Sequence, residues 1–158
     1  MLSDKAKFAI QALMSRYPDK RSAIMPALHL AQRECGWLSD EVLVDLSDLI
    51  GFSTTEINSV ATFYTMYARE KRGEHTIYFC TDLPCALRGA DELMEHIEHK
   101  LGCKAGQTTA DGKITLKDAE CLGGCDHAPV MLIDGEEHAQ DLNVEKIDAI
   151  LERLKSNS

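Results

Sequence analysis

The stretches CTDLPC at residues 80–85 and ECLGGC at residues 120–125 decide how the second half of this chain folds. Each follows a segment that reads as a β-strand or the end of one, so that two loops can meet at one point. Four thiolates that converge in this way hold either a tetrahedral zinc ion or an iron–sulfur cluster. With 35 residues between them, the two pairs are C-x4-C and C-x3-C: Cys80 and Cys85, then Cys121 and Cys125.

The spacing within each pair favours a cluster over zinc. Structural zinc sites usually space one of their pairs as C-x2-C, and neither pair here has that spacing. Loops with three and four intervening residues separate their sulfur atoms more widely, which suits a 2Fe-2S rhomb in which each loop ligates one iron. The 2Fe-2S cluster is the preferred interpretation, and a zinc-stabilised interaction module without a redox role is the alternative.

Two further cysteines, Cys35 and Cys103, have no second cysteine within five positions, and we expect them to be core or surface thiols. Disulfides are a poor explanation for any of the six. The first residues, MLSDK, do not resemble the start of a secretory signal, and a reducing cytosol keeps thiols free.

The charge is unevenly distributed along the chain. The net charge is −9 over 158 residues. Residues 1–72 have nine basic and nine acidic side chains and so contribute none of it, whereas residues 73–158 have eight basic and seventeen acidic side chains. An acidic surface repels phosphates and anionic lipid headgroups, so we expect no nucleic-acid partner. No apolar run is long enough to span a bilayer, so we expect no direct membrane insertion either. A protein partner is the better expectation.

The fold class predicted from the hydrophobic periodicity is α+β, with a boundary at about residue 72. Residues 1–72 form a small helical bundle, whose final aromatic group is expected in the core rather than on a binding surface. Its four helices are predicted at Ser3 to Tyr17, Ser22 to Cys35, Ser39 to Gly51, and Ser53 to the group Phe63, Tyr64 and Tyr67.

Residues 73–158 are predicted to form an open sheet with helices against it, in the order β-α-β-β-β-α. Asp134-Gly135 is a strong signal for a type I′ hairpin between the last two strands. The strands are predicted at 76–80, 114–116, 129–133 and 136–139, and the helices at 90–101 and 144–154, the latter capped by Asn143.

Five separated motifs between about residues 17 and 140 resemble the thioredoxin-like 2Fe-2S subunit of respiratory complex I, the NADH:quinone oxidoreductase. The resemblance is specific because all five fall in the right order. They are PALHLAQ at 26–32, GWLS at 36–39, VATFYTMY at 60–67, CTDLPCALRG at 80–89 and ECLGGCDHAPV at 120–130.

The resemblance implies a helical region followed by a thioredoxin-like ferredoxin domain at residues 73–158. It also implies an electron-transfer subunit without a complete active site, whose cluster lies near the flavin of a partner subunit that binds FMN and NADH. Such a subunit is cytoplasmic, in the peripheral arm of a membrane-attached complex. Related subunits serve NAD-linked hydrogenases and formate dehydrogenases, so the host complex stays open. The ligands that the resemblance assigns are Cys80, Cys85, Cys121 and Cys125.

The chemistry expected of the site is one-electron transfer. Two ferric ions, two sulfides and four thiolates sum to a charge of about −2, and one electron makes it −3. The carboxylates of Asp82 and Asp126, in or beside the loops, should therefore disfavour reduction. The chain lacks the C-x-x-C of a dithiol site and a Gly-rich phosphate loop, so disulfide exchange is not expected, and NAD and flavin would bind to a partner.

The histidines are not expected to be ligands. His127 lies two residues beyond Cys125 and could ligate as in a Rieske centre, but four cysteines already complete the cluster. His96 and His99 share one helix and are expected on a solvated face.

Overall fold

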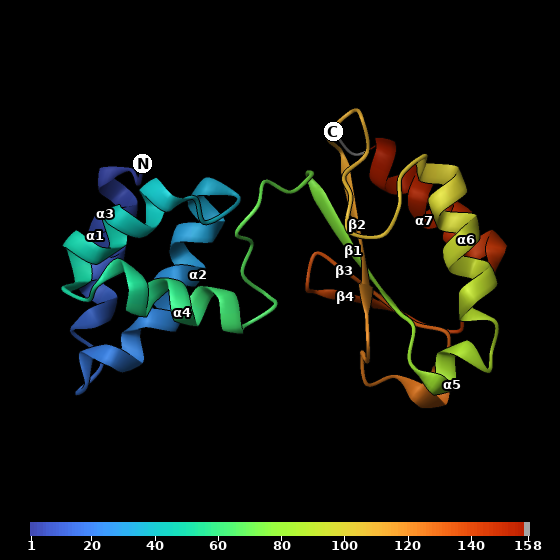
Figure 1. Ribbon diagram of the computed structural model, residues 1–158, viewed down its shortest axis with the longest axis horizontal. Coiled ribbons are helices and arrows are strands. Elements are labelled where there is room, and N and C mark those ends of the chain that lie inside the picture. The colour runs from blue at the N-terminus through green and yellow to red at the C-terminus, as the bar shows by residue number, and fades with distance from the viewer. Residues whose placement is uncertain (157–158) are drawn as a thin grey trace. The chain divides into compact units, whose positions relative to one another are not determined.

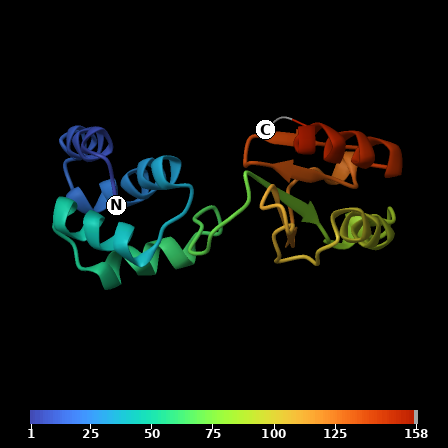
Figure 2. The ribbon, with the colours of Figure 1, turned by 90° about the horizontal axis from the view of Figure 1, so that it is seen from above.

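The computed structural model describes residues 1–156, and these form two compact units, divided between Lys71 and Arg72. The first unit is helical, and the second contains a four-stranded sheet with helices (Figures 1 and 2). Each unit has its own hydrophobic core. Within residues 1–156, no helix is long and apolar enough to cross a membrane.

The first unit confirms the predicted helical region. Serine side chains cap the starts of three of its helices, at Ser3, Ser39 and Ser53, and Ser53 forms a full capping box with Glu56. The α-helices are α1 (Asp4–Met14), α2 (Ile24–Cys35), α3 (Asp40–Ile50) and α4 (Thr54–Phe63), with a 3-10 helix, η1 (Lys20–Ala23), before α2.

One fully buried side chain from each α-helix makes the centre of this core: Ile10, Leu28, Leu46 and Ile57. The sequence placed the start of the second helix at about Ser22, but the chain first makes the turn η1. The Asp19 carboxylate accepts from the Arg21 amide at 2.9 Å and so begins a tighter 3-10 turn.

The aromatic group at the end of α4 corrects the sequence prediction of a core position. Phe63 is 77% exposed and Tyr64 is 37% exposed, whereas only Tyr67 is buried. The helix ends at Phe63 and the chain becomes extended at Tyr64, so the helical spacing that would bury all three is lost. Tyr67 packs inward because its hydroxyl donates to the Met25 carbonyl at 2.8 Å.

The second unit has the predicted order of strands and long helices. Its sheet runs in the order β2-β1-β3-β4, with β1 and β2 parallel and the other pairs antiparallel. The strands are β1 (His75–Cys80), β2 (Ile114–Ala119), β3 (Met131–Ile133) and β4 (Glu137–Ala139), and the helices are α5 (Leu83–Ala86), α6 (Ala90–Leu101), η2 (Cys125–His127) and α7 (Val144–Ser156).

Helices α6 and α7 lie on the same side of the sheet (Figure 1). Ile97 of α6 and Ile147 of α7 are fully buried in one cluster with Ile77 and Phe79 of β1. Because β1 is an interior strand that this cluster holds on the sheet, its last residue, Cys80, has a defined position.

The turn between β3 and β4 lies at the predicted Asp134-Gly135, but Ile133 pairs with Glu137, so the loop has three residues rather than the two of a simple type I′ hairpin. Asp134 and Gly135 have φ angles of 54° and 76°, and the Glu136 amide donates to the Ile133 carbonyl at 3.0 Å. The Asp134 carboxylate also accepts from the Thr76 amide at 2.7 Å, which ties the hairpin to β1.

Candidate iron–sulfur site

Both cysteine loops leave the sheet at the carboxyl ends of its two parallel strands. Cys80, the last residue of β1, is paired in register with Ala119, the last residue of β2. The Thr81 amide donates to the Ala119 carbonyl at 2.9 Å, so the two chains stay side by side as they enter the loops. The sheet therefore brings together residues that are far apart in the sequence.

The first loop holds a buried pair of thiols. Cys80 and Cys85 are 3% and 1% exposed, and the Cys80 Sγ lies 3.7 Å from the Glu120 carbonyl oxygen, directly before the second loop. Between them the chain forms the one-turn helix α5, in which the Asp82 carbonyl accepts from the Cys85 amide at 2.9 Å. Sequence periodicity missed this helix because it is a single turn, although Pro84 near its start is a typical signal.

The second loop presents an exposed pair. Cys121 and Cys125 are both exposed, and each is close enough to the other for their thiols to form a hydrogen bond. Gly123 between them has a φ of 76°, which glycine adopts without strain, and this conformation turns the chain back so that the two thiols meet.

The four cysteines thus form two pairs at one end of the sheet. Cys80 interacts electrostatically with both Cys85 and Cys125, so the pairs are near each other. Among residues 1–156, however, no three His, Cys, Asp or Glu side chains surround a common point as the ligands of a single metal ion do. Two pairs of sulfurs, one from each loop, fit a 2Fe-2S rhomb because each of its irons takes two protein ligands.

One thiol of each pair, Cys85 in the first and Cys125 in the second, has a pKa above its ordinary value. Burial raises the pKa of Cys85 to about 11, and a hydrogen bond with Cys80 adds to the rise, whereas a backbone hydrogen bond from Val130 opposes it. Partial desolvation, followed by the neighbouring Cys121, raises the pKa of Cys125. Protonated thiols are weak nucleophiles, which argues against disulfide exchange, and they must release protons when they ligate a metal.

The other two cysteines belong to neither cysteine loop. Cys35 packs against the core of the first unit, and Cys103 packs against the core of the second unit, just after α6. Burial is the first cause that raises the pKa of both thiols. Both are half-buried thiols, and that neither is a ligand stays a prediction.

One histidine prediction is wrong. His96 was expected on a solvated face, but its Nε2 lies 2.7 Å from an Asp148 carboxylate oxygen, and the Lys100 ammonium donates to the other oxygen at 2.9 Å. The group joins α6 to α7, a contact between helices that the periodicity of one helix does not reveal. His99 is exposed. His127 lies 3.1 Å from Asp141 by its Nδ1 atom.

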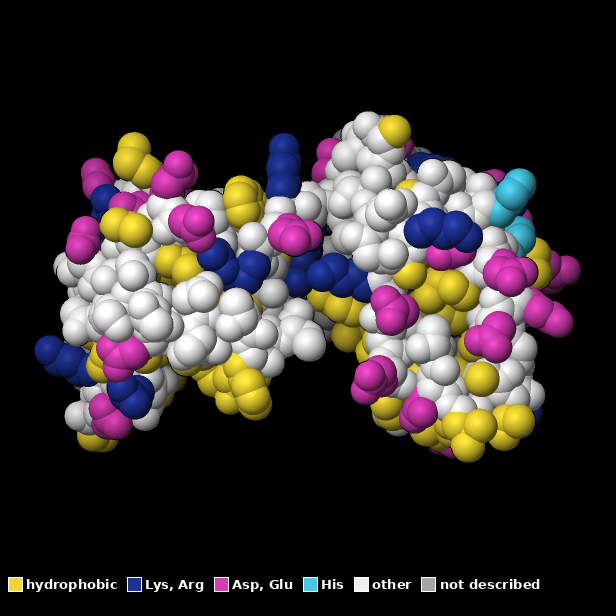
Figure 3. Space-filling model, viewed as in Figure 1, with side chains coloured by type: hydrophobic (Ala, Val, Ile, Leu, Met, Phe, Trp, Pro, Cys, Tyr) yellow, Lys and Arg dark blue, Asp and Glu magenta, His cyan; other side chains and the backbone are white. Residues whose placement is uncertain are grey.

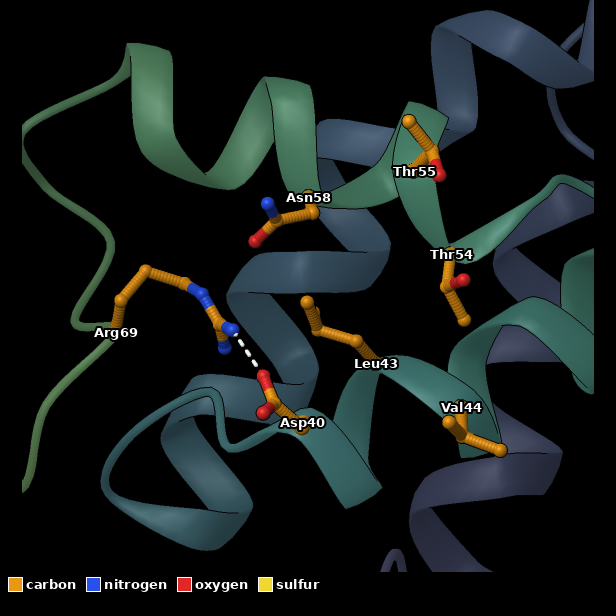
Figure 4. A pocket seen from close by; sticks show the side chains of 7 residues that line it. All are labelled: Asp40, Leu43, Val44, Thr54, Thr55, Asn58 and Arg69. Atoms are coloured by element: carbon orange, nitrogen blue, oxygen red, sulfur yellow. Dashed lines mark hydrogen bonds and ion pairs between the residues drawn. The ribbon is translucent and has the colours of Figure 1, made fainter.

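The first unit contains a shallow cavity of about 280 Å³ between α3 and α4 (Figure 4). At one side the Arg69 guanidinium donates to the Asp40 carboxylate at 2.5 Å, so neither charge is left to attract an ion. It holds no cysteine and is not a candidate redox site. It is lined by Asp40, Leu43, Val44, Thr54, Thr55, Asn58 and Arg69.

The sheet with two cysteine pairs at one end is the arrangement expected of one class of protein, the thioredoxin-like iron–sulfur proteins. A model of the family described as "Thioredoxin-like [2Fe-2S] ferredoxin" matches residues 10–155. The chain belongs to this family, and it is a 2Fe-2S electron carrier. The preference for a 2Fe-2S cluster over zinc is confirmed.

Two relatives, both of them NADH-quinone oxidoreductase subunits, are similar over nearly their whole length. The one from Rhizobium meliloti (strain 1021) is 41% identical over 147 residues, which are 93% of this chain and 87% of the relative. The one from Escherichia coli (strain K12) is 38% identical over 154 residues, 98% of this chain and 92% of the relative.

A solved structure, that of a NAD+-reducing [NiFe]-hydrogenase in the air-oxidized state, is also similar. It has a TM-score of 0.75 and 27% identity over 84% of this chain. The matched region is 23% of the hydrogenase chain, so this chain is similar to only a part of that larger protein.

Proposed function

We propose that this chain is the 2Fe-2S electron-transfer subunit of an NADH:quinone oxidoreductase, with Cys80, Cys85, Cys121 and Cys125 as the cluster ligands. The observation that carries the proposal is the pairing of the four thiols at the carboxyl ends of β1 and β2. The two relatives from NADH-quinone oxidoreductases support the host complex because the similarity covers most of both chains.

The cluster, when bound, accepts and releases one electron. Cys80 and Cys85 would hold one iron, and Cys121 and Cys125 the other, because the two thiols of each pair belong to one loop and interact with each other. The first pair shields its side from water, whereas the second pair reaches the surface. The chain thus insulates the cluster on one side and leaves an edge open for electron exchange.

The proposed partner is a subunit that binds FMN and NADH, with this chain on the cytoplasmic side in the peripheral arm of the complex. Two exposed apolar side chains lie in or just after the first cysteine loop, Leu83 at 67% and Leu87 at 78% exposed, and hydrophobic atoms gather over α5 (Figure 3). Exposed apolar surface beside a redox site supports a protein contact there. The acidic charge of the same unit argues against a nucleic acid or an anionic membrane.

The alternative is the equivalent subunit of an NAD-linked hydrogenase or formate dehydrogenase. The solved hydrogenase structure supports this alternative, because it is similar to 84% of this chain with a TM-score of 0.75. We prefer the NADH:quinone oxidoreductase because the relatives from that complex are 38% and 41% identical and of nearly equal length.

The experiment that tests the ligand assignment compares two cysteine variants of anaerobically purified protein. The wild type should be red-brown and contain two irons and two acid-labile sulfides per chain, with an electron paramagnetic resonance signal after reduction by dithionite. Cys121→Ala should abolish or grossly alter this spectrum, whereas the matched variant Cys103→Ala should keep it.

A colourless protein with one zinc per chain, even after reconstitution with iron and sulfide, would contradict the proposal. So would a normal cluster in Cys121→Ala. To test the host complex, the tagged chain is purified from its source under mild conditions and its companions are identified. Recovery of hydrogenase subunits instead of an NADH:quinone oxidoreductase would favour the alternative.

A further inference from the structure

We propose that His138 is a positioning residue for the cluster, because it holds the loop that carries Cys121 and Cys125. The proposal rests on the ligand assignment made above. His138 lies in β4, which is the edge strand of the sheet, and it is paired in register with Leu132 of β3. Its position is therefore set by the hairpin rather than by the cysteine loop.

The first contact is a hydrogen bond to the backbone of the loop. The His138 Nε2 atom lies 3.2 Å from the carbonyl oxygen of Leu122, which directly follows Cys121. A carbonyl oxygen only accepts hydrogen bonds, so Nε2 carries the proton and donates it. The bond joins the middle of the exposed loop to a strand of the sheet.

The second contact fixes the orientation of the ring. The Gln140 side-chain Nε2 lies 3.0 Å from His138 Nδ1 and donates to it. An accepting Nδ1 requires the tautomer whose proton is on Nε2, which is the tautomer that the bond to Leu122 needs. The two bonds agree, so the ring is held in one orientation from both nitrogens.

The third contact is steric. A Cβ atom on Gly124 would lie 2.7 Å from His138 Cε1 and 3.0 Å from Val130 Cγ1, so the loop backbone lies directly against the imidazole ring. Gly124 has a φ of −107°, which other residues adopt without strain. Glycine is therefore needed here for the space between the loop and His138 rather than for its backbone freedom.

Together these contacts give the second cysteine pair a rigid support. Cys121 and Cys125 are exposed, unlike Cys80 and Cys85, so their position depends on how the backbone of their loop is held. Groups that orient ligands from behind typically change metal affinity by about 10- to 100-fold when they are removed. We place His138 in this role.

The experiment uses the full-length holoprotein and four variants. His138→Leu removes both ring nitrogens, whereas His138→Gln keeps an N–H that can reach the Leu122 carbonyl. Gln140→Ala removes only the bond to Nδ1, and His99→Leu is the control at an exposed histidine on α6. The measurements are the rate of iron loss to a chelator, the visible circular dichroism of the cluster, its reduction potential, and the melting temperature of the apoprotein.

We expect His138→Leu to lose iron about tenfold faster than the wild type, with an altered circular dichroism spectrum. The rate of iron loss should be close to that of the wild type in His138→Gln and intermediate in Gln140→Ala. In His99→Leu it should equal that of the wild type. Wild-type iron loss, dichroism and potential in His138→Leu would overturn the proposal. A lower melting temperature with unchanged cluster signals would overturn it too, because it would show a purely structural role.

These outcomes are distinct from failure of the ligand assignment. That assignment fails if Cys121→Ala keeps a normal cluster, whatever His138 does. If Cys121→Ala loses the cluster and His138→Leu behaves as wild type, only the positioning role is wrong.

Discussion

Substitution of Gly124 by alanine inserts one methyl group between the second cysteine loop and its support. That methyl carbon would lie 2.7 Å from His138 Cε1 and 3.0 Å from Val130 Cγ1. Carbon atoms in good contact are about 3.5 to 4.0 Å apart, so the ring or the loop must move by roughly 1 Å. The φ of −107° at this position adds no backbone strain, so the effect is one of packing alone.

The expected loss of stability is about 1–3 kcal/mol, the usual range for an extra methylene in a packed site. The imidazole ring can relieve part of the overlap by rotating away, but it then gives up its bond to Leu122, worth about 0.5–1.5 kcal/mol. The contact with Val130 stays in either case. With an m-value of roughly 1–2 kcal/mol/M, the urea midpoint of the second unit should fall by on the order of 1 M.

The assay is urea unfolding of the reduced apoprotein, followed by circular dichroism, together with the visible spectrum of the holoprotein. His138→Ala combined with Gly124→Ala should recover part of the stability that Gly124→Ala loses, because the small side chain removes the closest contact. The control is Gly112→Ala, at a glycine where a Cβ atom meets nothing within 4 Å but whose φ is 74°. Its loss would come from the backbone and should not be recovered by His138→Ala. Wild-type stability in Gly124→Ala, or strictly additive losses in the double variant, would refute the steric reasoning.

Three further predictions concern charge and domain structure. Asp82→Asn should raise the reduction potential by on the order of tens of millivolts, because the Asp82 charge acts on Cys125 and disfavours the more negative reduced state. Asp126→Asn should raise the reduction potential less, since the Asp126 carboxylate is 81% exposed. Equal potentials in the wild type and the two variants would contradict this reasoning. A hydrogen bond from Lys100, followed by one from His96, lowers the pKa of Asp148 below its ordinary value of 3.8. Asp148 therefore contributes stability above about pH 4, and this stability is lost as the pH falls through the lowered pKa. Between pH 5 and pH 3, the melting temperature of Asp148→Asn should fall less steeply than that of the wild type. Parallel pH profiles would rule out this contribution. Deletion of residues 1–71 should leave the cluster spectrum of the second unit intact, because each unit has its own core, but it should weaken co-purification with the flavoprotein. Loss of the cluster would show instead that the two units depend on a shared core.

Local signals in the sequence were sufficient for most of the fold. Ser3, Ser39 and Ser53 mark helix starts because a serine oxygen satisfies a free amide of the first turn, and this depends on neighbours in the chain alone. Asp134-Gly135 predicts its hairpin for the same kind of reason. The four cysteines were recognised by their spacing and by a family resemblance. Their role as ligands stays a prediction until the variants are measured.

What the sequence could not provide are the contacts between elements distant in the chain. The support of the second cysteine loop by His138, 16 residues beyond Leu122, depends on the hairpin bringing β4 beside that loop. The pairing of His96 with Asp148 depends on the packing of α6 against α7. Phe63 was wrongly assigned to the core because periodicity does not show where a helix stops. Such contacts follow from tertiary packing, which overrides local pattern.

The register of β1 and β2 has a consequence for how the protein is assembled. Cys80 stands opposite Ala119, and a slip of two residues between the strands would displace one cysteine loop by roughly 7 Å relative to the other. The parallel pairing also requires the whole crossover through α6 to close before the two loops can meet. With the proposed ligands, all four thiols can reach one cluster only after this crossover has closed. We therefore expect iron content to report correct alignment of β1 with β2.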